Sequence, residues 1–259
     1  MAKTLRSSVK DALNRSIKGD LLSPTRFLGS TLDLDFAGTK SLKNAVDGKD
    51  LVTHTRASSA TYVDGDGVIR NAVTNLLLRS EDFSTTWFNF NSSESVNVAV
   101  APNGTLTADK LIPDVGVTNG LFRQDFGVNA FPNDIPMCLS VYAKAAEFGN
   151  MSLSYYNNAN TFCATGVDLT NGTFTSGPFN ATRSIEFVGN GWYRIAIFFS
   201  SGSGSNNANI RISCSNSGDG TSGIYLWGAQ LEEASTVGEY VKTTSTINSA
   251  PRFDHDPAT

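Results

Sequence analysis

The chain has 259 residues, 40% of them hydrophobic, and a formal net charge of −4, which is typical of a folded globular protein rather than a disordered one. No apolar run approaches the ~20 residues that span a bilayer, so the sequence predicts no membrane insertion. The three cysteines have no CxxC spacing, and their odd number favours buried, reduced thiols over a disulfide framework.

Residues 4–18 are the stretch with a clear helical pattern. Their apolar positions recur every four residues: Leu5, Val9, Leu13 and Ile17. An isolated helix of this length is marginal in water, so the apolar stripe needs a partner. That partner is the chain's own body, further copies of the chain or another protein. A linker with proline and glycine completes an N-terminal arm over residues 1–30.

This arm is also basic. Residues 1–30 contain six basic and two acidic side chains, whereas the whole chain carries a net charge of −4. A basic arm on an acidic body favours docking on an acidic partner, either protein or nucleic acid. The cations are spread out without aromatic interleaving, which is weak support for nucleic-acid binding. We therefore predict a protein partner and no nucleic acid.

From residue 31 onward, short segments alternate apolar and polar residues and are separated by turns rich in Gly, Asn and Ser. The clearest segments are Thr31–Phe36, Cys138–Lys144, Met151–Tyr155, Trp192–Phe199 and Ile210–Cys214. Successive side chains of a strand point to opposite faces, so each segment buries one face. The pattern predicts one mainly β domain over residues 31–259, an antiparallel sandwich or a barrel.

One segment, Gly220–Glu232, is apolar on both faces. This pattern predicts a strand inside the sandwich, and the short, glycine-interrupted run argues against a buried helix. Strict alternation divides its side chains into two sets. One face carries Tyr225, Trp227, Ala229 and Leu231, and the other carries Ile224, Leu226 and Gly228.

Candidate catalytic residues are sparse. The chain has two histidines, and no nucleophile motif such as GxSxG accompanies them. Two carboxylate pairs, Glu81-Asp82 and Glu232-Glu233, have the chemistry of a glycosidase, but adjacent strand residues point to opposite faces. Solvated charges explain both pairs better, so we predict no catalytic residue and no enzyme.

Calcium is the metal that the sequence suggests. Asp64–Gly67 and Asp219 offer oxygen ligands, but the first stretch lacks the later acidic ligand of a calcium loop. Hairpin turn chemistry explains that stretch. We therefore predict no metal site and no cofactor.

Aromatic side chains are the candidates for sugar contact. An exposed ring stacks on the apolar face of a sugar while polar neighbours bond its hydroxyl groups. The rings of interest are Trp87, Tyr156, Trp192 and Trp227, and the predicted glycan site consists of Trp87, Tyr156, Trp192 and Arg194. Trp192 and Arg194 share one face of a strand, opposite its apolar row, so alternation places them outside unless another layer covers them. Core or subunit-interface packing is the alternative for each ring.

Six segments in order carry a family resemblance. They are Thr55–Asp64, Asn75–Phe83, Ala101–Lys110, Ser140–Ala145, Gly189–Arg194 and Gly223–Glu232. Together they resemble segments that recur in the virion proteins of tailed phages, both tail-fibre-like and other structural proteins, whose modules resemble carbohydrate-binding jelly rolls. The resemblance covers roughly residues 31–259, so the arm lies outside it.

The resemblance implies a jelly-roll β-sandwich in a virion protein that is assembled in the host cytoplasm. It implies other virion proteins (tail, adaptor or capsid) and a homotrimer as partners, with a host surface glycan as the contact of the outward-facing sandwich. We expect Leu5, Val9, Leu13 and Ile17 to anchor the arm in the particle. Two alternatives stay open: a capsid decoration or adaptor protein without glycan binding, and a glycan depolymerase.

Overall fold

The computed structural model describes residues 42–44, 46–49, 52–58, 61–63, 69–157, 161–203 and 207–251. The helix predicted over residues 4–18, with Leu5, Val9, Leu13 and Ile17, lies outside the described residues. The chain divides into two compact units, and the two large sheets described below belong to the unit formed by Arg56–Tyr62 and Ile69–Ala250. No helix among the described residues has the length and hydrophobicity needed to span a bilayer.

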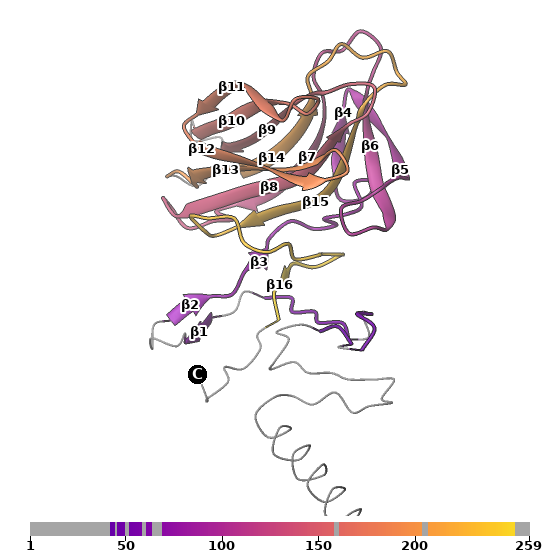
Figure 1. The fold of residues 1–259 in the computed structure, drawn as a ribbon. Coiled ribbons are helices and arrows are strands. Elements are labelled where there is room, and N and C mark those ends of the chain that lie inside the picture. Colours follow the sequence, from indigo (N-terminus) through magenta and orange to yellow (C-terminus); the bar gives the residue numbers. More distant parts are fainter. Residues whose placement is uncertain are drawn as a thin grey trace, which may run out of the picture. The chain divides into compact units, whose positions relative to one another are not determined.

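The described chain folds into two large antiparallel sheets, which confirms the predicted mainly β sandwich (Figure 1). Sheet I has the strand order β11 (Thr173–Phe179), β10 (Thr161–Asp168), β9 (Asn150–Asn157), β14 (Asn207–Cys214), β7 (Gly120–Val128) and β4 (Phe88–Phe90). Sheet II has the order β12 (Thr182–Gly189), β13 (Trp192–Ser200), β8 (Pro136–Ala145), β15 (Ile224–Glu232), β6 (Leu106–Pro113) and β5 (Ser92–Val100).

Two further pairs of short strands complete the described secondary structure. One pair is β1 (Thr61–Val63) with β2 (Ile69–Asn71), and the other is β3 (Thr74–Asn75) with β16 (Asn248–Ser249). The second pair ties the segment before the sandwich to the segment after it, because Thr74 and Ser249 share a hydrogen bond of 2.8 Å between their hydroxyl oxygens.

The main core lies between the two sheets and is built by the inward rows of the alternating strands. Met151, Leu153 and Tyr155 of β9 are buried there opposite Ile195 and Ile197 of β13. Alternation therefore predicted these strands correctly, because every second side chain leaves water and the residues between them remain on the outer faces.

Strand β15 departs from strict alternation at Gly228. Its φ of +62° and the register shift between Trp227 and Gln230 mark a β-bulge. The bulge moves Ala229 and Leu231 to the core with Leu226, whereas the sequence pattern placed them beside Trp227. A side chain at residue 228 would not fit, because a Cβ added to Gly228 would lie 2.9 Å from Tyr142 Cδ2.

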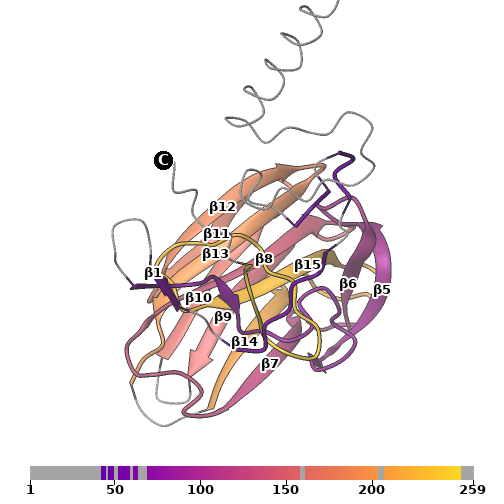
Figure 2. The ribbon, with the colours of Figure 1, turned by 90° about the horizontal axis from the view of Figure 1, so that it is seen from below.

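A second apolar cluster covers the outer face of sheet II. Trp192 and Trp227 pack there against Tyr142 and Tyr240, and Tyr240 belongs to the segment that follows β15. Gln230 fixes this segment, since its Nε2 donates to Glu239 O and its Oε1 accepts from Val241 N. Figure 2 shows the yellow C-terminal segment crossing in front of β8 and β15. Residues 238–243, which we call the C-terminal strap, thus form a third layer.

Candidate functional site

The outer face of sheet I has no such covering segment among the contacts of the described residues. Its strand register places one residue of each strand in a single row. From β11 to β4 this row reads Phe179, Ala164, Ser154, Arg211, Arg123 and Phe88. Cross-strand neighbours on one face lie close enough to act on the same ligand. We call this the central row.

Two parallel rows flank the central row on the same face. One reads Phe162, Tyr156, Asn209 and Asp125. The other reads Ser176, Gly166, Ser152, Ser213, Leu121 and Phe90. The three rows together bring residues from six separate strands onto one surface, which we call the sheet I face.

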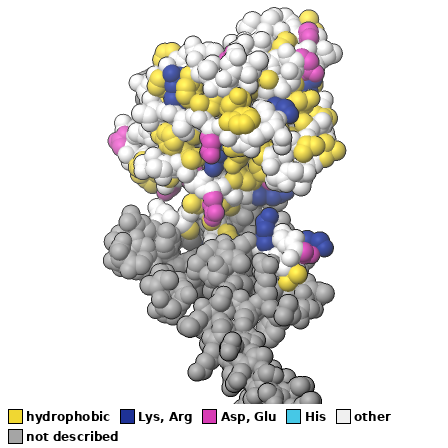
Figure 3. Space-filling model, in the orientation of Figure 1, with side chains coloured by type: hydrophobic (Ala, Val, Ile, Leu, Met, Phe, Trp, Pro, Cys, Tyr) yellow, Lys and Arg dark blue, Asp and Glu magenta, His cyan; other side chains and the backbone are white. Residues whose placement is uncertain are grey.

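The sheet I face has small side chains in its middle and aromatic rings at its edges. Ala164, Ser152 and Ser154 occupy the strands β10 and β9, and Ser213 continues them into β14. The edge rings are exposed: Phe162 by 42%, Phe179 by 53%, Phe88 by 51% and Phe90 by 49%. Figure 3, in the orientation of Figure 1, shows one side of the sandwich, where hydrophobic side chains lie at the surface among uncharged atoms and several acidic and basic groups.

Two arginines occupy neighbouring positions of the central row. The guanidinium of Arg211 lies 5.1 Å from the ring centroid of half-buried Tyr156, and its Nε donates a 2.8 Å hydrogen bond to Asn209 Oδ1. Arg123 lies 5.0 Å from the ring centroid of Phe88 and forms an ion pair with Asp125 at 3.0 Å. The tyrosine ring and the amide hold the Arg211 guanidinium in a fixed plane.

Of the four side chains predicted to contact sugar, the structure leaves Tyr156 on an open face. Trp87 is 6% exposed and its Nε1 donates to Arg79 O, while Trp192 is 1% exposed and its Nε1 donates to Val100 O. Arg194 is 8% exposed beneath the C-terminal strap. Alternation placed Trp192 and Arg194 on the outer face of their sheet. It could not detect that the strap lies over Arg194 or that the end of β5 contacts Trp192.

The edge phenylalanines and Arg211 were not singled out from the sequence. Each occurs in an ordinary alternating strand, where an outward ring or cation is common. Their common face depends on the register of β9, β14 and β7, which are separated by long stretches of chain. A single sequence carries no signal for such pairing.

The carboxylate pairs do not form a catalytic arrangement among the described residues. Glu81 accepts hydrogen bonds from Lys242 Nζ at 2.6 Å and Tyr240 OH at 3.1 Å. Glu232 is 2% exposed and accepts a hydrogen bond from Gly238 N at 2.9 Å, and its burial raises its pKa. Glu233 is exposed, so the two neighbours of that pair have different surroundings.

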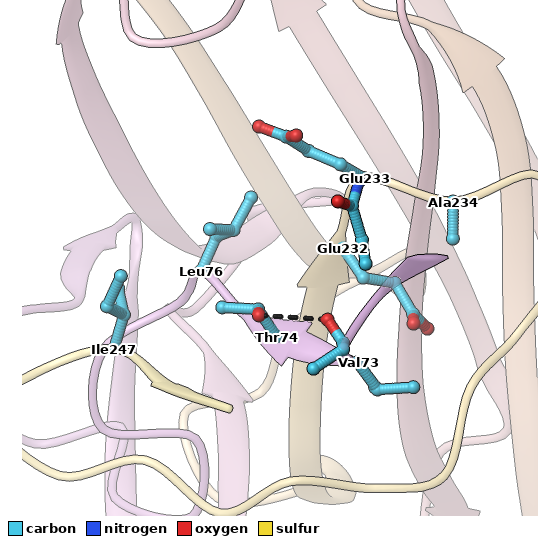
Figure 4. Close-up of a pocket in the computed structure, with 9 residues that line it drawn as sticks. Val73, Thr74, Leu76, Glu232, Glu233, Ala234 and Ile247 are labelled. Atoms are coloured by element: carbon cyan, nitrogen blue, oxygen red, sulfur yellow. Dashed lines mark hydrogen bonds between the residues drawn. The ribbon is translucent and has the colours of Figure 1, made fainter. Parts of the chain in front are cut away.

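A hollow of about 180 Å³ adjoins the second carboxylate pair. Val73, Leu76 and Ile247 contribute much of its apolar lining. Figure 4 shows Glu232 and Glu233 leaving the chain in different directions at one side of the hollow. Thr74 Oγ1, also in the lining, is bonded to Ala72 O at 3.1 Å. The hollow therefore does not bring two carboxylates together on one substrate.

The described part of the chain contains no group of three or more His, Cys, Asp or Glu side chains that could hold a metal ion. Asp219, considered above as a calcium ligand, instead accepts hydrogen bonds from Thr221 N and Ser222 N in a turn. The hydrogen bond from the Ser222 hydroxyl, together with these two backbone bonds, lowers the pKa of Asp219. The stretch Asp64–Gly67 lies outside the described residues.

No protein-family model and no curated protein matches the chain. Among solved structures, a tailspike protein of bacteriophage CBA120 (enzymatically active domain) is 14% identical over 62% of this chain, with a TM-score of 0.41. This chain spans 21% of that tailspike chain.

Two structures with sugar-related descriptions match this chain with similarly low sequence identity and TM-score. A putative sugar-binding protein of Bacteroides thetaiotaomicron is 12% identical over 62% of this chain and all of its own, with a TM-score of 0.39. A carbohydrate-binding module of Cellvibrio mixtus lichenase 5A, in complex with cellotriose, is 11% identical over 62% of this chain and 98% of its own, with a TM-score of 0.34. These likenesses are distant, and the function proposed below depends on the residues of this chain.

Proposed function

We propose that the sandwich is a glycan-binding module that uses the sheet I face and carries out no catalysis. The observation that carries this proposal is the register of sheet I, which brings half-buried Tyr156 and Arg211 together with Asn209 on its outer face. Rings supply apolar surface for the faces of sugars, and amide and guanidinium groups supply hydrogen bonds for their hydroxyl groups.

The extent of the face favours an oligosaccharide over a single sugar. Six strands spaced about 4.8 Å apart put Phe179 and Phe88 on the order of 24 Å from each other. Between them lie small side chains, of which Ala164, Ser154 and Ser213 are only 6–7% exposed. Rings at both ends then provide stacking positions that several sugar units could reach together.

The strand order supports a jelly-roll description of the sandwich. The strands β6, β15, β8 and β13 of sheet II face β7, β14, β9 and β10 of sheet I. In chain order these eight strands change sheet at every step except the β9–β10 hairpin, which is the pattern of a double-sheet jelly roll. The remaining strands β4, β5, β11 and β12 extend the four edges.

For the whole chain we propose a fibre-like virion protein of a tailed phage. The sequence resemblance supports this role. The arm, through Leu5, Val9, Leu13 and Ile17, docks on other virion proteins, and the sandwich faces outward as a homotrimer to contact a host surface glycan. A decoration or adaptor protein without glycan binding is the competing role.

A glycan array probed with the full-length chain tests the proposal. We expect selective binding, and we expect Tyr156→Ala to weaken it roughly tenfold because a stacking ring is lost. Phe187→Ala is the matched control, since Phe187 is an exposed ring of β12 in sheet II. An array without any bound glycan, or equal losses in both variants, would favour the decoration or adaptor role.

A further inference from the structure

We propose that the sheet I face selects an anionic glycan and that Arg211 binds its acidic group. This inference rests on the proposed function, since it names the class of glycan for the same face. The inference depends on the contacts that the Arg211 guanidinium makes within the chain. Its Nε donates a hydrogen bond to Asn209 and its planar face lies over the ring of Tyr156. The two terminal amino groups are therefore left as donors for a ligand.

Those terminal amino groups have no acceptor among the described residues. The ion pairs of the described chain do not include Arg211, whereas Arg123 beside it is paired with Asp125. A guanidinium presents its donors as a planar fork, and the fork matches a carboxylate, sulfate or phosphate through two parallel hydrogen bonds. The available pair of donors therefore fits an anion better than a single hydroxyl group.

The charges that neighbour Arg211 also favour an anionic ligand. Arg211 and Arg123 are direct cross-strand partners, and like charges in such positions repel each other. Asp125 offsets the charge of Arg123, but the charge of Arg211 has no such partner on the face. A bound anion would supply the missing negative charge at this point, which a neutral sugar cannot do.

No carboxylate of the described face competes for this position. Asp125 is held by Arg123 Nε at 3.2 Å and Nη2 at 3.0 Å. Asp168, at the end of β10, accepts hydrogen bonds from Thr170 N and the side chain of Asn171, which fixes it in the turn after that strand. Arg211 is thus available to a ligand that brings its own acidic group.

The test compares charged and neutral glycans on one array. Suitable probes are hyaluronan and polysialic acid for carboxylates, dextran sulfate for sulfate esters, a polyglycerol-phosphate teichoic acid for phosphate, and dextran and galactan as neutral chains. We expect the strongest binding to an anionic probe. The ester and carboxylate probes separate the sources of negative charge, and carboxyl-reduced hyaluronan provides the neutral counterpart of the same backbone.

Variants then assign the selectivity to one residue. We expect Arg211→Gln to weaken binding of the anionic probe by roughly tenfold or more, and Arg211→Lys to restore part of it because the charge returns without the fork. Lys144→Gln removes a positive charge from β8 in sheet II and serves as the control for net charge. It should leave the affinity unchanged.

The two proposals fail in different ways. Neutral glycans that bind best, depend on Tyr156 and are insensitive to Arg211→Gln would overturn the selection of an acidic group and leave glycan binding intact. Equal losses in Arg211→Gln and Lys144→Gln would show attraction by net charge and overturn the role of Arg211. Absence of binding to every probe would overturn both proposals.

Discussion

Arg194 Nη1 donates a 2.7 Å hydrogen bond to Gly238 O, which joins strand β13 to the C-terminal strap. Its Nη2 donates to Ser140 Oγ at 3.2 Å, and the guanidinium lies 5.2 Å from the ring centroid of Tyr142. This buried cation holds the strap on sheet II, so the residue predicted to contact sugar stabilises the fold at this position.

Replacement of Arg194 should therefore lower stability. We expect Arg194→Met to reduce the free energy of unfolding by about 2–3 kcal/mol, because two hydrogen bonds from a buried charged group are lost. Urea denaturation of the purified protein measures this change. Arg211→Met, which removes a half-buried arginine from the sheet I face, should cost less than about 1 kcal/mol. Equal costs for the two variants would contradict the role of Arg194.

The bulge at Gly228 should make this position sensitive to substitution. Gly228→Ala should destabilise the protein by more than about 1 kcal/mol, since the position has a φ of +62° and an added Cβ would meet the ring of Tyr142. Gly127→Ala is the matched control, because its Cβ would meet nothing within 4 Å and its φ is not positive. Thermal unfolding of both variants compares them, and an equal loss of stability would argue against the bulge.

The chain pattern predicted the sandwich because burial within one strand is a local property. Alternation identified the inward rows of β9 and β13, and it identified β15 as a strand apolar on both faces. The bulge at Gly228 was missed because a glycine in an apolar run does not show where the alternation changes phase. The C-terminal strap and the sheet I face were missed because they depend on contacts between segments far apart in the chain.

Glu232 should give the protein a pH-dependent stability. Burial raises its pKa above the usual 4.5, although hydrogen bonds from Gly238 and Gln230 oppose the shift. The folded state therefore holds the proton more tightly than the unfolded state, and this group's contribution to stability falls as the pH rises from about 4.5 through the folded pKa. Glutamine does not ionise, so we expect Glu232→Gln to gain stability relative to the parent as the pH rises over that range. Denaturation at several pH values measures it, and a difference that is constant with pH would contradict the assignment.

The three cysteines should be unreactive in the folded protein. All are buried and free, and burial raises the pKa of Cys138 to about 12 and that of Cys163 to about 11. Since the thiolate is the reactive form, we expect almost no reaction with Ellman's reagent at pH 8 and three reactive thiols in denaturant. Rapid labelling of the native protein would contradict the packing of β8, β10 and β14.

Backbone amide NMR shifts during titration with the glycan selected on the array test the central claim most directly. We expect the shifts to cluster on β9, β14 and β7, around Tyr156, Asn209 and Arg211, with little change on β13 and β15. Shifts confined to sheet II or to the hollow beside Glu232 would contradict the assignment of glycan binding to the sheet I face.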